Sequence, residues 1–165
     1  MHALDVLDNL VQFLHDNLQD FLLQTENGNE VPPKVYDGYL PPKQNNRAGL
    51  NEDTPLQEEY PFIIVRYLDD DDEMYVSNRV AYRIIVATYS DDEQHGWREN
   101  LGLMIRIKSL LRQQQIIGAA NLVGKIETRL FEEQRKPSYH GYMVVEYEIP
   151  QIQEKSKELT PDGFY

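Results

Sequence analysis

Alternation of apolar and polar positions predicts four strands along the chain. Residues 80–89 are rich in β-branched and aromatic residues, and their apolar side chains recur at the strand period of two. Residues 60–68 predict a strand that pairs with 80–89 as an antiparallel hairpin, with the acidic run 69–73 at its tip. Two further strands are expected over 122–131, with Leu122, Ile126 and Leu130 inward, and over 142–149.

Apolar residues at steps of three and four predict two helices. The first is expected over residues 3–24 and ends near Asn27 and Gly28. The second is expected over about 91–115. Ser90 and Glu93 have the spacing of a capping box, in which the hydroxyl and the carboxylate each accept a hydrogen bond from the other residue's backbone N–H.

The second predicted helix is apolar over an unusually wide arc. At about 100° per residue its apolar positions span roughly 220°, whereas a surface helix needs a stripe of only roughly 100°. One side is expected to face the sheet, and the flank contacts either another subunit or the first helix. Trp97, Leu101 and Ile105 are therefore candidate subunit contacts.

Residues 25–60 are rich in Pro, Asn and Gly and are expected to form a long loop. Within it, residues 35–40 predict a short strand or a hairpin around Asp37 and Gly38. Loops of this length are usually functional or disordered. The segment therefore either makes assembly contacts, with Tyr36 and Tyr39 as candidates, or is disordered.

The order of elements predicts an α+β fold: an antiparallel sheet of about four main strands, with two helices packed on one face. A single domain is expected over residues 1–150, followed by an extended tail over 151–165 whose Phe164 and Tyr165 are further candidate contacts. The outer sheet face, with Glu146 and Glu148 on the last strand, is expected to meet solvent or a neighbouring subunit.

Composition narrows the class of protein. The 165 residues suffice for one domain with a real core, and the chain has no cysteine for a disulfide or a thiolate metal site. The N-terminus has neither a basic segment nor a long apolar run, so a cytoplasmic protein is expected. A net charge of -12 argues against wrapping free nucleic acid, although it allows a surface that nucleic acid passes without binding.

The sequence contains few residues suited to catalysis. The four histidines form no metal-binding pair, and no nucleotide-binding or nucleophile motif is present. Residues 69–73 have the carboxylates that Mg²⁺ or Ca²⁺ prefers, but they lack the glycine and the spacing of a calcium loop. We expect no catalytic residue, metal site or cofactor. The alternative, a carboxylate-dependent metal enzyme such as a nuclease, requires metal binding and a cleft.

Three phrases suggest a family: YPFIIVRYLDDDDE, then RVAYRIIVATYSDDEQHGWRENLGLMIRIKSLL, then LFEEQRKPSYHGYMVVEYEIP. In this order they resemble the tail terminator (tail completion) proteins of long-tailed phages and prophages of Gram-positive bacteria. The resemblance covers residues 60–150 and rests on packing and turn features. Tyr147 stands where the family also has tryptophan.

The resemblance implies a virion assembly protein with no enzymatic activity. Such proteins form a ring, usually hexameric, on the head-proximal end of the tail tube, where the ring stops tube polymerisation and presents the surface that joins the head. The implied partners are further copies of the chain, the tube protein and a head-completion or connector protein; assembly occurs in the host cytoplasm, and no membrane is involved. The alternative is another neck component, such as a head-completion or head–tail connector protein.

DNA passes through the lumen of such a ring during ejection without specific binding. Because a ring of carboxylates repels phosphate, we expect the acidic residues to line or rim the channel. The candidates are Asp69, Asp70, Asp71, Asp72, Glu73, Glu146 and Glu148.

Overall fold

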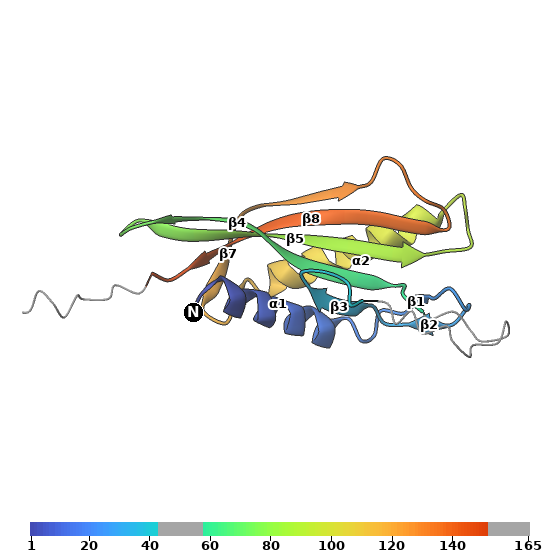
Figure 1. Ribbon diagram of the computed structural model, residues 1–165, viewed down its shortest axis with the longest axis horizontal. Coiled ribbons are helices and arrows are strands. Elements are labelled where there is room, and N and C mark those ends of the chain that lie inside the picture. The colour runs from blue at the N-terminus through green and yellow to red at the C-terminus, as the bar shows by residue number, and fades with distance from the viewer. Residues whose placement is uncertain (43–57, 152–165) are drawn as a thin grey trace, which may run out of the picture.

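The chain folds into two helices and two sheets over the part that the computed structural model describes, residues 1–42 and 58–151. Figure 1 shows the arrangement. The elements are α1 (Ala3–Asn17), β1 (Leu23–Gln24), β2 (Glu30–Val31), β3 (Lys34–Asp37), β4 (Phe62–Glu73), β5 (Ser77–Tyr89), α2 (Gly96–Gln113), β6 (Ile116–Ile117), β7 (Ala120–Leu130) and β8 (Ser138–Ile149).

The main sheet has six strands in the order β3-β4-β5-β8-β7-β6, and β1 and β2 form a separate two-stranded sheet. The four predicted strands are its antiparallel centre, so the α+β class is confirmed. The sheet is larger than predicted because two short strands extend it. β6 pairs with β7 through two residues, and β3 pairs in parallel with β4, which follows much later in the sequence.

Both helices pack on the same face of this sheet. α1 lies against β3 and β4, whereas α2 lies against β8, β5 and β7. The alternate residues predicted to face inward are buried and meet both helices in one core. They are Val80, Tyr82, Ile84 and Val86 on β5, and Met143, Val145, Tyr147 and Ile149 on β8.

α1 ends seven residues earlier than predicted. The apolar pattern misled because Leu18 and Leu23 are buried in the core although they lie beyond the helix. The Asn17 side chain donates to the Phe13 carbonyl (2.7 Å), which satisfies one of the free acceptors at the helix end. Leu23 then pairs with Val31, a contact that local periodicity cannot reveal.

α2 begins at Gly96, later than predicted, and the expected Ser90–Glu93 capping pair caps no helix. Asp92 instead accepts from the backbone N–H groups of Gln94 and His95, both at 3.0 Å, so it stabilises the turn before the helix. These hydrogen bonds to its ionised form lower the pKa of the Asp92 carboxyl.

The segment expected as one long loop is structured on both sides of residues 43–57. β3 confirms the short strand predicted around Tyr36. The alternative of a hairpin at Asp37 and Gly38 is wrong, because β3 pairs in parallel with β4. Glu26 accepts from the backbone N–H groups of Glu59 and Tyr60, at 2.8 and 2.7 Å. These bonds tie the turn between β1 and β2 to the chain entering β4.

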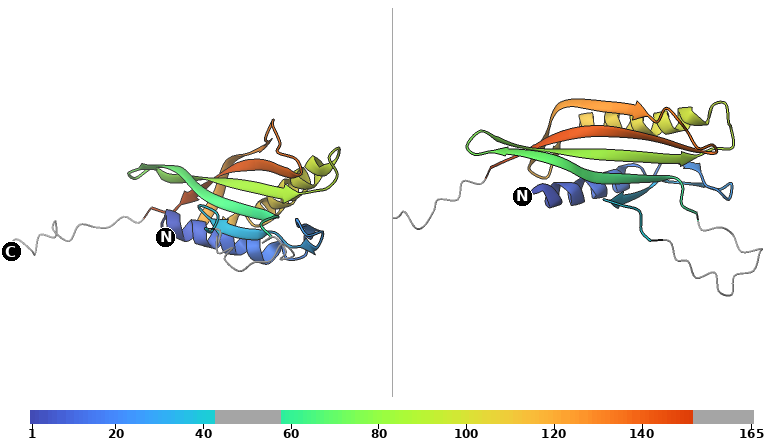
Figure 2. Two further views of the ribbon diagram at one scale, coloured as in Figure 1. Left: turned by 45° about the vertical axis from the view of Figure 1, so that its right-hand side comes forward. Right: turned by 45° about the horizontal axis from the view of Figure 1, so that its top comes forward.

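The acidic run does not form the hairpin tip. Residues 69–73 are the last five of β4 and pair with β5 across a bulge after Tyr67. The turn itself contains Met74, Tyr75 and Val76. The strand continues through the acidic run because its carboxylates are exposed and cost nothing in desolvation. The hairpin therefore reaches past the start of α1 to one end of the molecule (Figures 1 and 2).

Candidate assembly surfaces

Residues of the second and third phrases meet at the start of α2. The Ser90 N–H donates to the Pro137 carbonyl (3.0 Å), and the hydroxyl of buried Tyr139 donates to the Asp92 carbonyl (3.2 Å). Gly96 lies so close to the Tyr139 ring that a Cβ there would approach it to 2.5 Å. The strand-to-helix junction and the start of β8 are thus joined as one packing unit.

A buried asparagine completes this junction. The side-chain amide of Asn100 on α2 donates to the Val86 carbonyl (3.1 Å), the Thr88 hydroxyl (3.2 Å) and the Tyr139 carbonyl (2.9 Å). Its own oxygen faces Gly141, where a Cβ would lie only 2.8 Å away. Sequence inspection missed Asn100 because a single polar residue in a helix gives no pattern. The junction holds α2 on β5 and β8, so its role is structural.

Carboxylates from two strands gather on the sheet face opposite the helices. Residues directly opposite each other in adjacent strands point to the same face. Asp69, Ala81 and Glu146 form one such row, and Asp71, Arg79 and Glu148 form the next. The structure thus brings together acidic candidates that lie more than seventy residues apart in sequence.

The remaining acidic candidates differ in their surroundings. Asp70 and Asp72 lie opposite Val80 and Asn78, toward the helix side of the sheet, so strand alternation divides the run between two faces. Asp70 accepts a hydrogen bond from the Tyr67 hydroxyl, and this bond raises the pKa of that phenol. Glu73 lies opposite Ser77, next to the hairpin turn.

α2 presents an apolar row away from the sheet. Trp97, Leu101 and Ile105 are four residues apart and so lie on one side of the helix. Trp97 is 40% exposed and Ile105 is 54% exposed, whereas Leu101 is half-buried against the core. The flank of the wide apolar arc therefore remains largely open to solvent.

The hairpin tip is a second apolar surface, which sequence inspection missed. Met74 and Tyr75 are each 74% exposed and Val76 is 66% exposed. Tyr75 has a φ of 65°, a conformation that non-glycine residues seldom adopt outside tight turns. The sequence did contain a signal for this surface, because three consecutive apolar residues lie between the acidic run 69–73 and the polar residues Ser77 and Asn78.

The two tyrosines near β3 lie on the same face as the carboxylate rows. Tyr36 packs, half-buried, against a small cluster formed by Phe62, Ile64 and Ala87. Tyr39 is 72% exposed, with the Arg66 guanidinium 4.3 Å from its ring centroid. The last two contact candidates, Phe164 and Tyr165, lie outside the described residues.

Neither a metal cluster nor a membrane-spanning helix is found in the described residues. No group of three or more His, Asp or Glu side chains among them is placed to hold a metal ion. No helix within residues 1–42 and 58–151 is long and apolar enough to cross a membrane. Comparison with protein-family models finds no matching family, and comparison with curated proteins finds no match.

Proposed function

We propose that this chain is a tail terminator: a virion assembly protein whose copies form a ring that caps the head-proximal end of a phage tail tube. The proposal rests on the resemblance over residues 60–150. It gains support because the phrases that carry the resemblance meet in the packing unit at the start of α2. They therefore describe one local structure.

The observation that carries the proposal is the apolar surface left exposed at separate places on the chain. The hairpin tip, the α2 row and the tyrosines beside β3 come from different elements. Exposed apolar surface of this kind is typical of interaction sites, and three such surfaces suit a subunit with several neighbours. Ring closure needs two different faces on each subunit, because head-to-tail contacts join unlike surfaces. A third surface is then available to contact the tail tube protein.

In this proposal the ring is a hexamer and the carboxylates of Glu146 and Glu148 face its lumen. Repetition of these two carboxylates around the ring gives a negative field that lets DNA slide without binding. The ring stops tube growth on one side and meets the head-completion or connector protein on the other. The chain is thus a component of the virion, assembled in the host cytoplasm and acting without enzymatic activity or a cofactor.

The test is electron microscopy of particles from a phage or prophage with a nonsense mutation in this gene. Overlong, headless tails beside separate filled heads are expected, because nothing would then stop tube growth. A plasmid copy of the gene should restore both tail length and head attachment. Tails of normal length without heads would instead indicate a head-side connector, and intact infectious particles would refute any role in the virion.

A further inference from the structure

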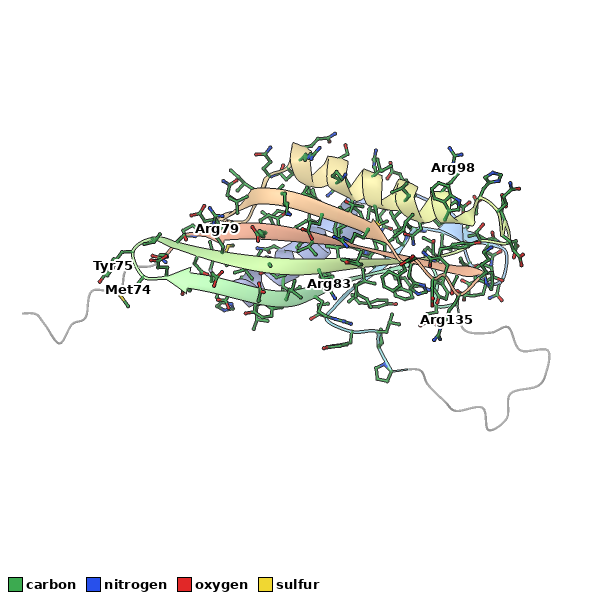
Figure 3. The ribbon with its side chains drawn as sticks, turned by 90° about the horizontal axis from the view of Figure 1, so that it is seen from above. Met74, Tyr75, Arg79, Arg83, Arg98 and Arg135 are labelled. Carbon is green, nitrogen blue, oxygen red and sulfur yellow. The ribbon has the colours of Figure 1, made fainter. Side chains whose placement is uncertain are left out.

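The outer face of the sheet contains two arginines directly opposite each other. Arg66 on β4 pairs with Arg83 on β5, and both side chains are half-buried on the face away from the helices. Like charges in this arrangement destabilise a sheet. Figure 3 looks onto this face and shows Arg83 in the middle of β5.

Both guanidinium groups are held in place by neutral partners. Arg66 donates through Nε to the Gly38 carbonyl (2.8 Å) and lies over the Tyr39 ring. Arg83 lies over the Tyr142 ring at 4.9 Å, and its buried Nε has no hydrogen-bond partner. Within the described residues neither forms an ion pair. Two fixed, adjacent guanidinium groups of this kind suit an incoming carboxylate or phosphate.

An apolar area adjoins the arginine pair. The next rows of the same face are Ile64 opposite Ile85, and Phe62 opposite Ala87. Tyr36, Leu40 and Tyr60 pack around these side chains. Going from the middle of the strands toward the start of β4, the face therefore presents positive charge and then apolar side chains.

The β4–β5 hairpin has the complementary order. Asp69 and Asp71 face outward on its β4 strand, and the exposed apolar tip follows them. Asp71 and Tyr75 are four residues apart, as are Arg83 and Ala87. At roughly 3.3 Å per residue, four residues span at most ~13 Å, so on each surface the apolar side chains lie within this distance of the charge. The tip lies at the end of the molecule and cannot reach its own sheet face (Figures 2 and 3).

We infer that the hairpin of one copy docks on the outer sheet face of a second copy. Asp69 and Asp71 then meet the Arg66 and Arg83 pair, and Tyr75 covers the apolar area around Tyr36. The contact joins unlike surfaces, as a closed ring requires, and in this respect it rests on the proposed function. DNA is a poorer occupant, because Glu146 and Glu148 on the same face repel a polyanion more strongly than they repel two carboxylates.

Disulfide trapping in assembled tails tests the contact, since the chain has no cysteine of its own. Tyr75→Cys combined with Tyr36→Cys should give a ladder of linked copies on a non-reducing gel after oxidation. Tyr75→Cys combined with Ile105→Cys is the matched control, and it should give no ladder because the α2 row lies on the other side of the sheet. A ladder from the control pair alone would overturn the inference.

Charge exchange then tests the arginines. Arg83→Glu in the trapping background should reduce the ladder at least tenfold, and adding Asp71→Arg to the same chain should restore it. Arg112→Glu, an equal charge change on exposed α2 surface, should have no effect. If Arg83→Glu fails to fold, Arg83→Gln removes the charge without reversing it. An unchanged ladder in a folded Arg83 variant would overturn the contact.

Further outcomes separate this contact from the proposed function. Overlong tails in the nonsense mutant without a Tyr36–Tyr75 ladder in complemented particles would overturn the contact and leave the terminator role standing. Tails of normal length in the mutant, with a ladder from the purified chain, would refute the role and support the contact. If Arg83→Glu weakens binding of short duplex DNA but leaves the ladder intact, the site binds phosphate and the contact is wrong.

Discussion

Asn100→Ala should destabilise the fold more than any other single polar truncation on α2. Asn100 is fully buried, and its amide contacts acceptors on both central strands, the carbonyls of Val86 and Tyr139 and the hydroxyl of Thr88. Alanine leaves two carbonyls without this donor, and an unsatisfied buried group costs about 1–3 kcal/mol. A loss of about 3 kcal/mol is therefore expected, or a fall in Tm of about 6–12 °C for a chain of this length.

Urea denaturation followed by circular dichroism measures this loss. Gln113→Ala is the control, because the Gln113 amide makes only an exposed contact with Ser109 (3.3 Å) and its loss should cost less than about 0.5 kcal/mol. Thr88→Val should cost less than Asn100→Ala, since it leaves both carbonyl contacts in place. An Asn100→Ala chain within about 1 kcal/mol of the parent would refute the reasoning that this amide joins α2 to the sheet.

Three other predictions concern stability and transport. Burial lowers the pKa of His140 below its usual 6.5, so the folded state prefers the neutral ring. The free energy of unfolding should therefore fall as the pH drops below 6.5, and His140→Gln should make Tm less dependent on pH in this range. Leu103→Ala should cost about 2–5 kcal/mol in urea denaturation, whereas Ile105→Ala should cost less than about 0.5 kcal/mol and instead weaken assembly into tails. Reversing Glu146 and Glu148 together to lysine should leave tail length unchanged and slow DNA ejection in a fluorescence assay; an unchanged rate would contradict a lumen position.

Sequence periodicity located the elements that pair with near neighbours in the chain. β8 alternates cleanly because one face is fully buried and the other is only half-buried, so its inward residues were predictable one by one. The inward residues of β5 followed from the same period of two, although outward Ala81 and Ala87 are also buried. β3 was uncertain because its partner strand, β4, begins almost thirty residues later. The C-terminal end of α1 was wrong because Leu18 continues the apolar stripe after the helix has stopped.

The candidate surfaces were predictable in composition but not in arrangement. The row of Trp97, Leu101 and Ile105 follows from helical geometry alone. In contrast, the outward set Asp69, Asp71, Glu146 and Glu148 depends on the β4–β5 and β5–β8 registers, including the bulge after Tyr67. A shift of one residue would have turned each carboxylate to the other face.

The short length of β3 has a consequence for the protein before assembly. β3 pairs only with residues 62–65, so no strand of the described chain pairs with β4 beyond Val65 on that edge. An unpaired strand edge can form hydrogen bonds with a strand of another chain, and charged side chains on the edge commonly prevent such aggregation. Five consecutive carboxylates protect this edge at neutral pH. The net charge of the whole chain falls to zero near its isoelectric point of about 4.7, so repulsion between copies weakens there and acidic buffers should promote precipitation by edge pairing.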